Sequence, residues 1–166
     1  MRFYSAAGLV LLLLAGWMHR APFTMEPYFH GHVVRVGEGE TFVAPDSPNG
    51  LGMDSDWYIV DGDTWTIPNC IGHGLGLEML IHNVPNDVTE LRFVLDFPPM
   101  TLPNGETNSR TERMVDIFVD DRVGYFEYYY FFDYEYEASP GDWRFRLYHG
   151  DKLLFDEAFT VVLCEE

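Results

Sequence analysis

The chain has 166 residues, 47% hydrophobic and 16% aromatic, which suffices for one domain with its own core and excludes disorder as its overall state. Its formal charge of −17, from 10 Lys and Arg against 27 Asp and Glu, disfavours nucleic acid and anionic lipid headgroups as partners. A basic peptide, a cationic protein or a divalent cation is electrostatically allowed, although an acidic surface also serves solubility alone.

The N-terminus carries Arg2 followed by an apolar stretch of 13 residues, Ala6 to Met18. That length matches the core of a signal peptide and is shorter than the roughly 20 residues that a spanning helix needs. We therefore predict a signal peptide or a retained anchor helix over residues 1–21. The rest of the chain is then exported to the periplasm or the extracellular space, with membrane contact only through this segment if it is not cleaved.

Two cysteines, Cys70 and Cys164, fit a single disulfide in an exported protein, although each could equally be a free buried thiol. We predict the disulfide. Their spacing does not suggest a zinc site, and no cofactor is expected.

The first half of the chain predicts short strands among loops. Residues 19–31 are expected to be an extended lead-in to a strand at 32–36. Strands at 57–60 and 64–67 follow, with the turn Asp61-Gly62-Asp63 as a hairpin tip between them.

Clear two-residue periodicity follows Cys70. The segments 74–84 and 89–98 each collect apolar residues on one parity, which predicts strands with one face on a core. The buried positions are expected to be Leu75, Leu77, Met79, Ile81, Leu91, Phe93, Leu95 and Phe97. Residues 98–113 are expected to be a long polar loop, followed by a strand at 114–119.

An aromatic run, YFEYYYFFDYEYE at 125–137, separates by parity. Its even positions are all Phe or Tyr, whereas Glu127, Asp133, Glu135 and Glu137 share the odd parity. A strand collects those acids on one side, so we predict one long strand, bent or bulged, with the even face buried. Tyr125, Tyr129 and Phe131 are then the exposed aromatics.

A final hairpin over 143–163 turns at His149-Gly150-Asp151 and places Trp143, Phe145 and Leu147 inward. Seven or eight strands separated by turn signals, and no helix after residue 21, predict an all-β fold. The specific expectation is an immunoglobulin-like antiparallel β-sandwich, one domain over residues 28–164.

Three segments, TIPNCIGHGLGLEM at 66–79, FPPMTLPNGET at 97–107 and PGDWRFRLYHGDKLLFDEAFTV at 140–161, resemble an uncharacterised bacterial family of exported domains of unknown function with an immunoglobulin-like fold. The resemblance covers residues 28–163 and implies a fold and a compartment. It implies no activity and no binding residues. The acidic, tyrosine-rich strand departs from the family pattern.

Candidate sites are few. Asp54, Asp56, Asp61 and Asp63 could gather around calcium, but these residues also suit loop turns. His30 and His32 could hold a transition metal only with a third ligand, which the sequence does not identify. Tyr125, Tyr129 and Phe131 could stack on a sugar or receive a peptide.

No nucleophile motif is recognisable, so we predict no catalytic residue and no enzymatic activity. The expected function is a non-catalytic binding or accessory module of the cell envelope, whose partner is a protein, a peptide or a glycan. The alternatives are a calcium-stabilised structural domain and a carbohydrate or peptide binder that uses the aromatic strand.

Overall fold

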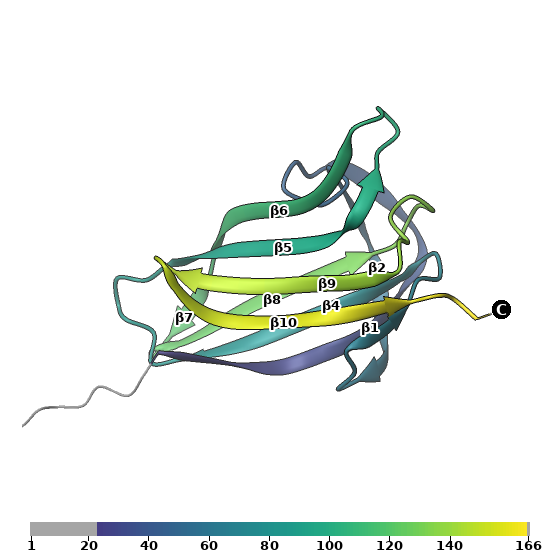
Figure 1. Ribbon diagram of the computed structural model, residues 1–166. Helices are drawn as coiled ribbons and strands as arrows, with labels where there is room; N and C mark the ends of the chain where they lie inside the picture. Colours follow the sequence, from purple (N-terminus) through teal and green to yellow (C-terminus); the bar gives the residue numbers. More distant parts are fainter. Residues whose placement is uncertain (1–22, 166) are drawn as a thin grey trace, which may run out of the picture.

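The computed structural model describes residues 23–165, and these form a sandwich of two five-stranded sheets (Figure 1). The first sheet has the order β2-β1-β4-β8-β7 and the second the order β3-β10-β9-β5-β6. The strands are β1 (Thr24–Val43), β2 (Leu51–Gly62), β3 (Thr66–Pro68), β4 (His73–His82), β5 (Glu90–Thr101), β6 (Thr107–Asp116), β7 (Phe118–Asp120), β8 (Val123–Phe131), β9 (Gly141–His149) and β10 (Lys152–Val162).

All strand pairs in this part of the chain are antiparallel except β3 with β10, which is parallel. The prediction of an all-β sandwich is confirmed, with ten strands instead of seven or eight in the described residues. Residues 23–165 contain no helix long and apolar enough to span a bilayer. The signal peptide or anchor helix expected over residues 1–21 lies outside the described residues.

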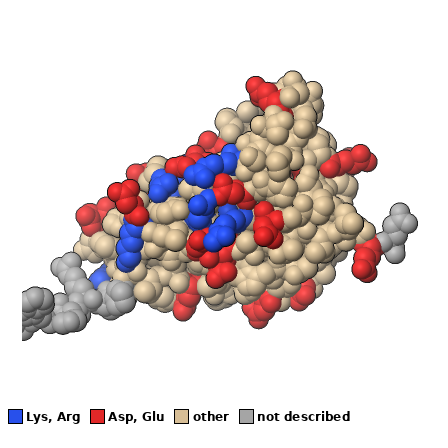
Figure 2. All heavy atoms as spheres, viewed as in Figure 1, with Lys and Arg blue, Asp and Glu red and all other residues tan. Residues whose placement is uncertain are grey.

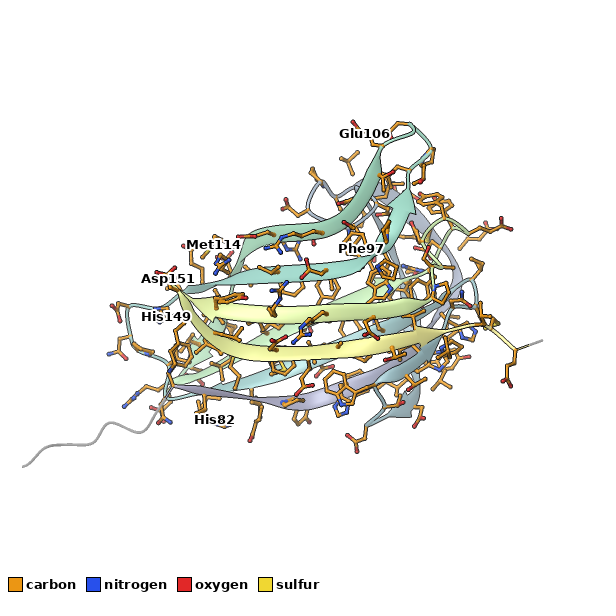
Figure 3. All side chains as sticks on the ribbon, in the orientation of Figure 1. His82, Phe97, Glu106, Met114, His149 and Asp151 are labelled. Atoms are coloured by element: carbon orange, nitrogen blue, oxygen red, sulfur yellow. A yellow bond between two sulfur atoms is a disulfide. The ribbon has the colours of Figure 1, made fainter. Side chains whose placement is uncertain are left out.

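The core lies between the sheets and is built by the predicted parities (Figure 3). Leu75, Leu77, Met79 and Ile81 of β4 are fully buried, and Leu91, Phe93, Leu95 and Phe97 of β5 are nearly so, as expected. Trp143 of β9 lies among the rings of Phe97, Tyr130 and Phe132. Each such side chain stabilises the fold by about 1.5–3 kcal/mol through burial.

The final hairpin follows its prediction closely. β9 and β10 pair across the turn at His149-Gly150-Asp151, and Trp143, Phe145 and Leu147 are fully buried. The tip lies at one end of the sandwich, where Figure 3 labels His149 and Asp151.

The prediction for β1 is wrong, because the lead-in and the short strand form one 20-residue strand. Pro27, Gly37 and Gly39 lie at irregularities in the pairing. The register shifts between Pro27 and Phe29 against β4, and between Val36 and Glu40 against β2. A bulge accommodates residues that would break a regular ladder.

The turn Asp61-Gly62-Asp63 is not a hairpin tip, which corrects another prediction. β2 pairs with β1 in the first sheet, whereas β3 pairs with β10 in the second. The chain therefore crosses between sheets at this turn, and Asp63 adopts the left-handed conformation with φ of 56°.

The segment 98–113 is not a long loop. β5 continues to Thr101, and β6 begins at Thr107 after a short turn around Gly105. β6 is the terminal strand of its sheet, and most of its residues are exposed or half-buried. It therefore lacks the apolar alternation from which strands are predicted.

The aromatic run is a nine-residue strand and a turn, which corrects the single long strand. The even parity is buried as predicted at Phe126, Tyr128, Tyr130 and Phe132. β8 ends at Phe131, and the next residues turn because the Glu137 carboxylate accepts hydrogen bonds from the backbone N–H groups of Asp133 and Tyr134. Glu137 is thus fully buried and Asp133 is half-buried, whereas Glu127 and Glu135 are exposed as predicted.

Polar contacts fix the turn of the β1–β2 hairpin, residues 44–50, against the rest of the sandwich. Asn49 donates to Glu137 in the turn after β8, and the carbonyl of Pro48 accepts a hydrogen bond from Asn108 of β6.

A disulfide joins Cys70 to Cys164, with their Cα atoms 5.0 Å apart. The disulfide ties the loop before β4 to the end of β10.

Candidate functional site

A hollow lies at an open side of the sandwich, between β8 and β6. One cavity of about 480 Å³ is lined by the β1–β2 hairpin, Arg113 of β6 and residues 127–131 of β8. A second cavity of about 410 Å³ is lined by β6, Phe118 of β7 and residues 125–127 of β8. Both cavities share Arg113 and Glu127, so they form one hollow, which we call the edge groove.

The edge groove follows a strand whose outer side is unpaired. β7 pairs only with residues 123–125 of β8, and the register between β8 and β4 runs on to Phe131. β6 is the terminal strand of the opposite sheet. Residues 126–131 therefore have a strand partner on one side only in the described chain.

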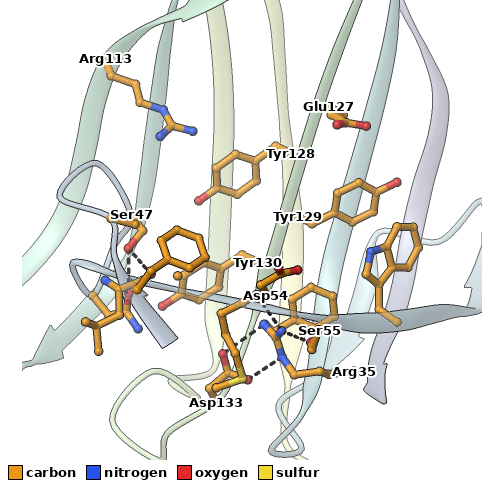
Figure 4. Close-up of a pocket in the computed structure, with 18 residues that line it drawn as sticks. Arg35, Ser47, Asp54, Ser55, Arg113, Glu127, Tyr128, Tyr129, Tyr130 and Asp133 are labelled. Atoms are coloured by element: carbon orange, nitrogen blue, oxygen red, sulfur yellow. Dashed lines mark hydrogen bonds and ion pairs between the residues drawn. The ribbon is translucent and has the colours of Figure 1, made fainter. Parts of the chain in front are cut away.

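Side chains from both faces of β8 reach this groove, as Figure 4 shows. Tyr128 and Tyr130 point to one side of the strand and Tyr129 to the other. This arrangement follows from the alternation of side chains along a strand, combined with a cavity that wraps around the strand's edge.

The outer wall is aromatic. The rings of Trp57 and Tyr129 lie 4.4 Å apart, and the Tyr129 hydroxyl donates to the carboxylate of Glu78. Tyr129 lies over Gly76 of β4, where a Cβ atom would stand 2.6 Å from its ring. Only glycine at this position lets the ring approach the sheet so closely.

The inner wall contains polar atoms without partners. Tyr130 is 6% exposed, and its hydroxyl has no hydrogen-bond partner among the described residues; neither has the Nε of Arg113. The Arg113 guanidinium lies 5.9 Å from the Tyr128 ring and 5.8 Å from the Phe93 ring. A buried hydroxyl left unpaired costs about 1–3 kcal/mol, so a ligand that supplied a partner would recover that cost.

One end of the edge groove is closed by a buried ion pair. Arg35 of β1 donates to both carboxylate oxygens of Asp133, at 2.9 and 3.2 Å, and also to the Met53 carbonyl and the Ser55 hydroxyl. Its guanidinium lies 4.2 Å from the Phe131 ring. Burial raises the pKa of Asp133, and the charge of Arg35 opposes that rise.

Glu137 is buried next to the same end of the edge groove, where it contacts Asp133. Burial raises its pKa to about 7, although the hydrogen bonds donated by the Asp133 N–H and the Asn49 amide lower it. Desolvation outweighs those bonds because the carboxylate is fully buried. With a pKa of about 7, the Glu137 carboxyl therefore gains or loses its proton near neutral pH.

Among the predicted aromatic residues, Tyr125 and Tyr129 are half-buried and line the edge groove. Phe131 is only 8% exposed, because Arg35 covers its ring, so the prediction that it is exposed is wrong. Sequence reasoning missed Trp57 and Arg113. Trp57 was expected only as part of a short strand, and Arg113 was expected in a loop.

The four aspartates do not form a metal cluster. Asp54 and Asp56 lie on β2, and Asp61 and Asp63 lie near its end, all exposed. No group of three or more His, Cys, Asp or Glu side chains in residues 23–165 is arranged to hold a metal ion. Asp54 does line the edge groove.

The histidines are arranged differently from the sequence pattern. His30 stacks on Trp65, with ring centroids 4.1 Å apart, while His32 is buried and contacts His73 of β4 at 2.9 Å between ring nitrogens. Burial lowers the pKa of both His32 and His73. The pair joins β1 to β4 without a third ligand among the described residues.

Positive side chains gather on the outer face of the second sheet, as Figure 2 shows, with acids among them. Arg92, Arg110, Arg144 and Arg146 each form an ion pair with Glu112, Asp96 or Asp156. This patch is therefore neutralised by its own neighbours and is a weak candidate for an anion site.

The fold and the edge groove define an immunoglobulin-like β-sandwich with one open side. A solved structure of an immunoglobulin-like protein from Pseudomonas aeruginosa has the same fold, with a TM-score of 0.55 and 17% sequence identity, covering 87% of this chain and 99% of that one. The chain belongs to the family described as Domain of unknown function (DUF3859), whose model matches residues 53–161. No curated protein matches this sequence.

Proposed function

We propose that this protein is a non-catalytic binding module that holds an extended ligand chain, either a peptide or a glycan, in the edge groove. One observation carries the proposal: two adjoining cavities, of about 480 and 410 Å³, follow the unpaired side of β8. Pockets of this size accommodate ligands of several hundred daltons. The stacked pair of Trp57 and Tyr129 supplies a rigid apolar contact surface beside it.

The compartment is part of the proposal. We place the protein outside the cytoplasm, because Cys70 and Cys164 form a disulfide and such bonds persist in oxidising space. The apolar segment at Ala6 to Met18 has the length of a signal-peptide core.

The test screens wild-type protein in parallel on a glycan array and on a random peptide library. We expect specific binding in one of the two, weakened about tenfold or more by Trp57→Ala. An exposed aromatic side chain that becomes buried under a ligand is a common source of binding energy. Tyr58→Ala is the matched control, since Tyr58 is the next residue of β2 and does not line the groove. Specific binding that survives Trp57→Ala unchanged would place the site elsewhere.

A further inference from the structure

The inference rests on the proposed function and names the ligand and its mode of attachment. We propose that the edge groove receives a peptide with alternating basic and apolar residues, which adds to the first sheet as a strand beside β8. Strand addition of this kind takes its affinity from main-chain hydrogen bonds and its specificity from alternate side chains.

The backbone of β8 provides the hydrogen bonds. The N–H of Phe132 donates to the His73 carbonyl, and its own carbonyl accepts from the Gly72 N–H, so both its main-chain groups face β4. Alternate residues of a strand direct these groups to opposite sides. The main-chain groups of Glu127, Tyr129 and Phe131 therefore face the open side.

The length of the groove suits an extended chain. Its lining includes every unpaired residue of β8, from Phe126 to Phe131, and these six at about 3.3 Å each extend for about 20 Å. A strand of about six residues fits that length. A second copy of this chain is a poorer occupant, because each copy carries a formal charge of −17.

The two faces of β8 require different peptide side chains. On the outer face, Glu127 and Asp54 are exposed carboxylates beside the rings of Trp57 and Tyr129, which suits Lys or Arg. On the inner face the rings of Phe126, Tyr128 and Tyr130 line the groove beside Arg113, which suits apolar side chains and disfavours basic ones. Exposed Met114 and Phe118 extend this apolar lining along the groove.

The unpartnered polar atoms support the same occupant. The Tyr130 hydroxyl and the Arg113 Nε each have an unused donor at the inner wall, in the described part of the chain. Both are donors, and a peptide strand presents a carbonyl oxygen at every residue. A peptide main chain can therefore satisfy both, whatever its sequence.

The experiment pans a random seven-residue peptide library on wild-type protein and then measures binding of the enriched peptide by calorimetry. We expect alternating basic and apolar residues. N-methylation of peptide residues on one parity should weaken binding about tenfold or more at each position, and on the other parity less than about threefold, because only one parity pairs with β8.

Two protein variants complete the test. Glu127→Pro removes a main-chain N–H that faces the groove and not β4, so we expect a folded protein that loses the peptide. Glu127→Lys should weaken binding several-fold, whereas Glu135→Lys, an equal charge change outside the groove lining, should not. N-methylation of the peptide decides the question even if Glu127→Pro does not fold.

The outcomes separate the inference from the proposed function. A bound glycan, or a peptide whose affinity is insensitive to N-methylation on both parities, overturns strand addition. The groove remains a binding site in that case if Trp57→Ala still weakens binding about tenfold or more. A dimer linked through β8, detected by light scattering and lost in Glu127→Pro, also overturns the peptide as occupant. Absence of peptide enrichment over a blank surface overturns it as well.

Discussion

The core and the closed end of the edge groove are stabilised by different forces. Between the sheets, apolar side chains such as Phe93, Phe132 and Trp143 are almost fully buried and contact one another. At the groove end, Arg35, Asp133 and Glu137 fix the β1–β2 hairpin through charged hydrogen bonds. Hydrophobic burial is non-directional and insensitive to pH, whereas buried charges depend on geometry and protonation. The core therefore sets stability, and the groove end sets the shape of the site.

The largest effect is expected in the core. Phe132→Ala removes a fully buried ring and should lower the free energy of unfolding by about 3–5 kcal/mol. Tyr129→Ala, on the other parity, should cost much less, because that ring is only half-buried and lies over Gly76 at the surface. Urea unfolding of the two variants measures both values. Equal losses would contradict the contrast between core and groove.

An intermediate effect is expected from the ion pair. Arg35→Met leaves the Asp133 carboxylate buried without its cation and should cost about 3 kcal/mol. The double variant Arg35→Met with Asp133→Leu should recover part of that loss, because no uncompensated charge remains. A double-mutant cycle by urea unfolding gives the coupling. A loss below about 1 kcal/mol for Arg35→Met would show that this end behaves like an ordinary surface pair.

The smallest effect concerns pH. Because the pKa of Glu137 is raised to about 7 in the folded protein, the native state binds a proton more tightly than the unfolded chain between about pH 4.5 and 7. The contribution of Glu137 to stability is therefore largest below pH 5 and decreases as pH rises through 7. We expect the contribution of Glu137 to the free energy of unfolding to fall by about 2 kcal/mol between pH 5 and pH 7, because burial raises the pKa of its carboxyl.

The measurement compares the stability of wild-type protein and Glu137→Gln from pH 5 to 8. The lowered pKa values of His32 and His73 act in the opposite direction, adding stability as pH rises toward 6.5, so the difference between the two proteins isolates Glu137. Parallel pH profiles for the two proteins would show that Glu137 stays ionised in the fold.

The alternation of apolar and polar residues in the sequence was sufficient to predict which side chains form the core. The strict alternation of Leu75 to Ile81 and of Leu91 to Phe97 predicted which faces are buried, because a strand has a fixed period of two and one face must leave water. The same reasoning placed the even positions from Phe126 to Phe132 correctly, but it was wrong for Phe131. It did not locate the end of the strand, because Glu137 stops it through hydrogen bonds to backbone groups several residues earlier.

The edge groove could be predicted only in part. The aromatic strand marked Tyr125 and Tyr129, but Trp57 and Arg113 belong to segments far from it in sequence and reach the groove through β2 and β6. The glycines of HGLGLEM were a usable signal, since Gly74 and Gly76 leave the outer face of β4 open for the side chains of β8.

By itself, the sequence determined the all-β class, the buried parities and the final hairpin, because these depend on local periodicity and on turn residues that act over a few positions. Tertiary structure alone decided that β7 is too short to cover β8 and that β6 ends the opposite sheet, which together open the edge groove. It also decided which acids are buried, because Glu137 has partners in its own turn and in the distant β1–β2 hairpin, whereas Glu127 lies exposed on β8. Pairing between distant strands and desolvation are properties of the assembled sandwich, and no local pattern encodes them.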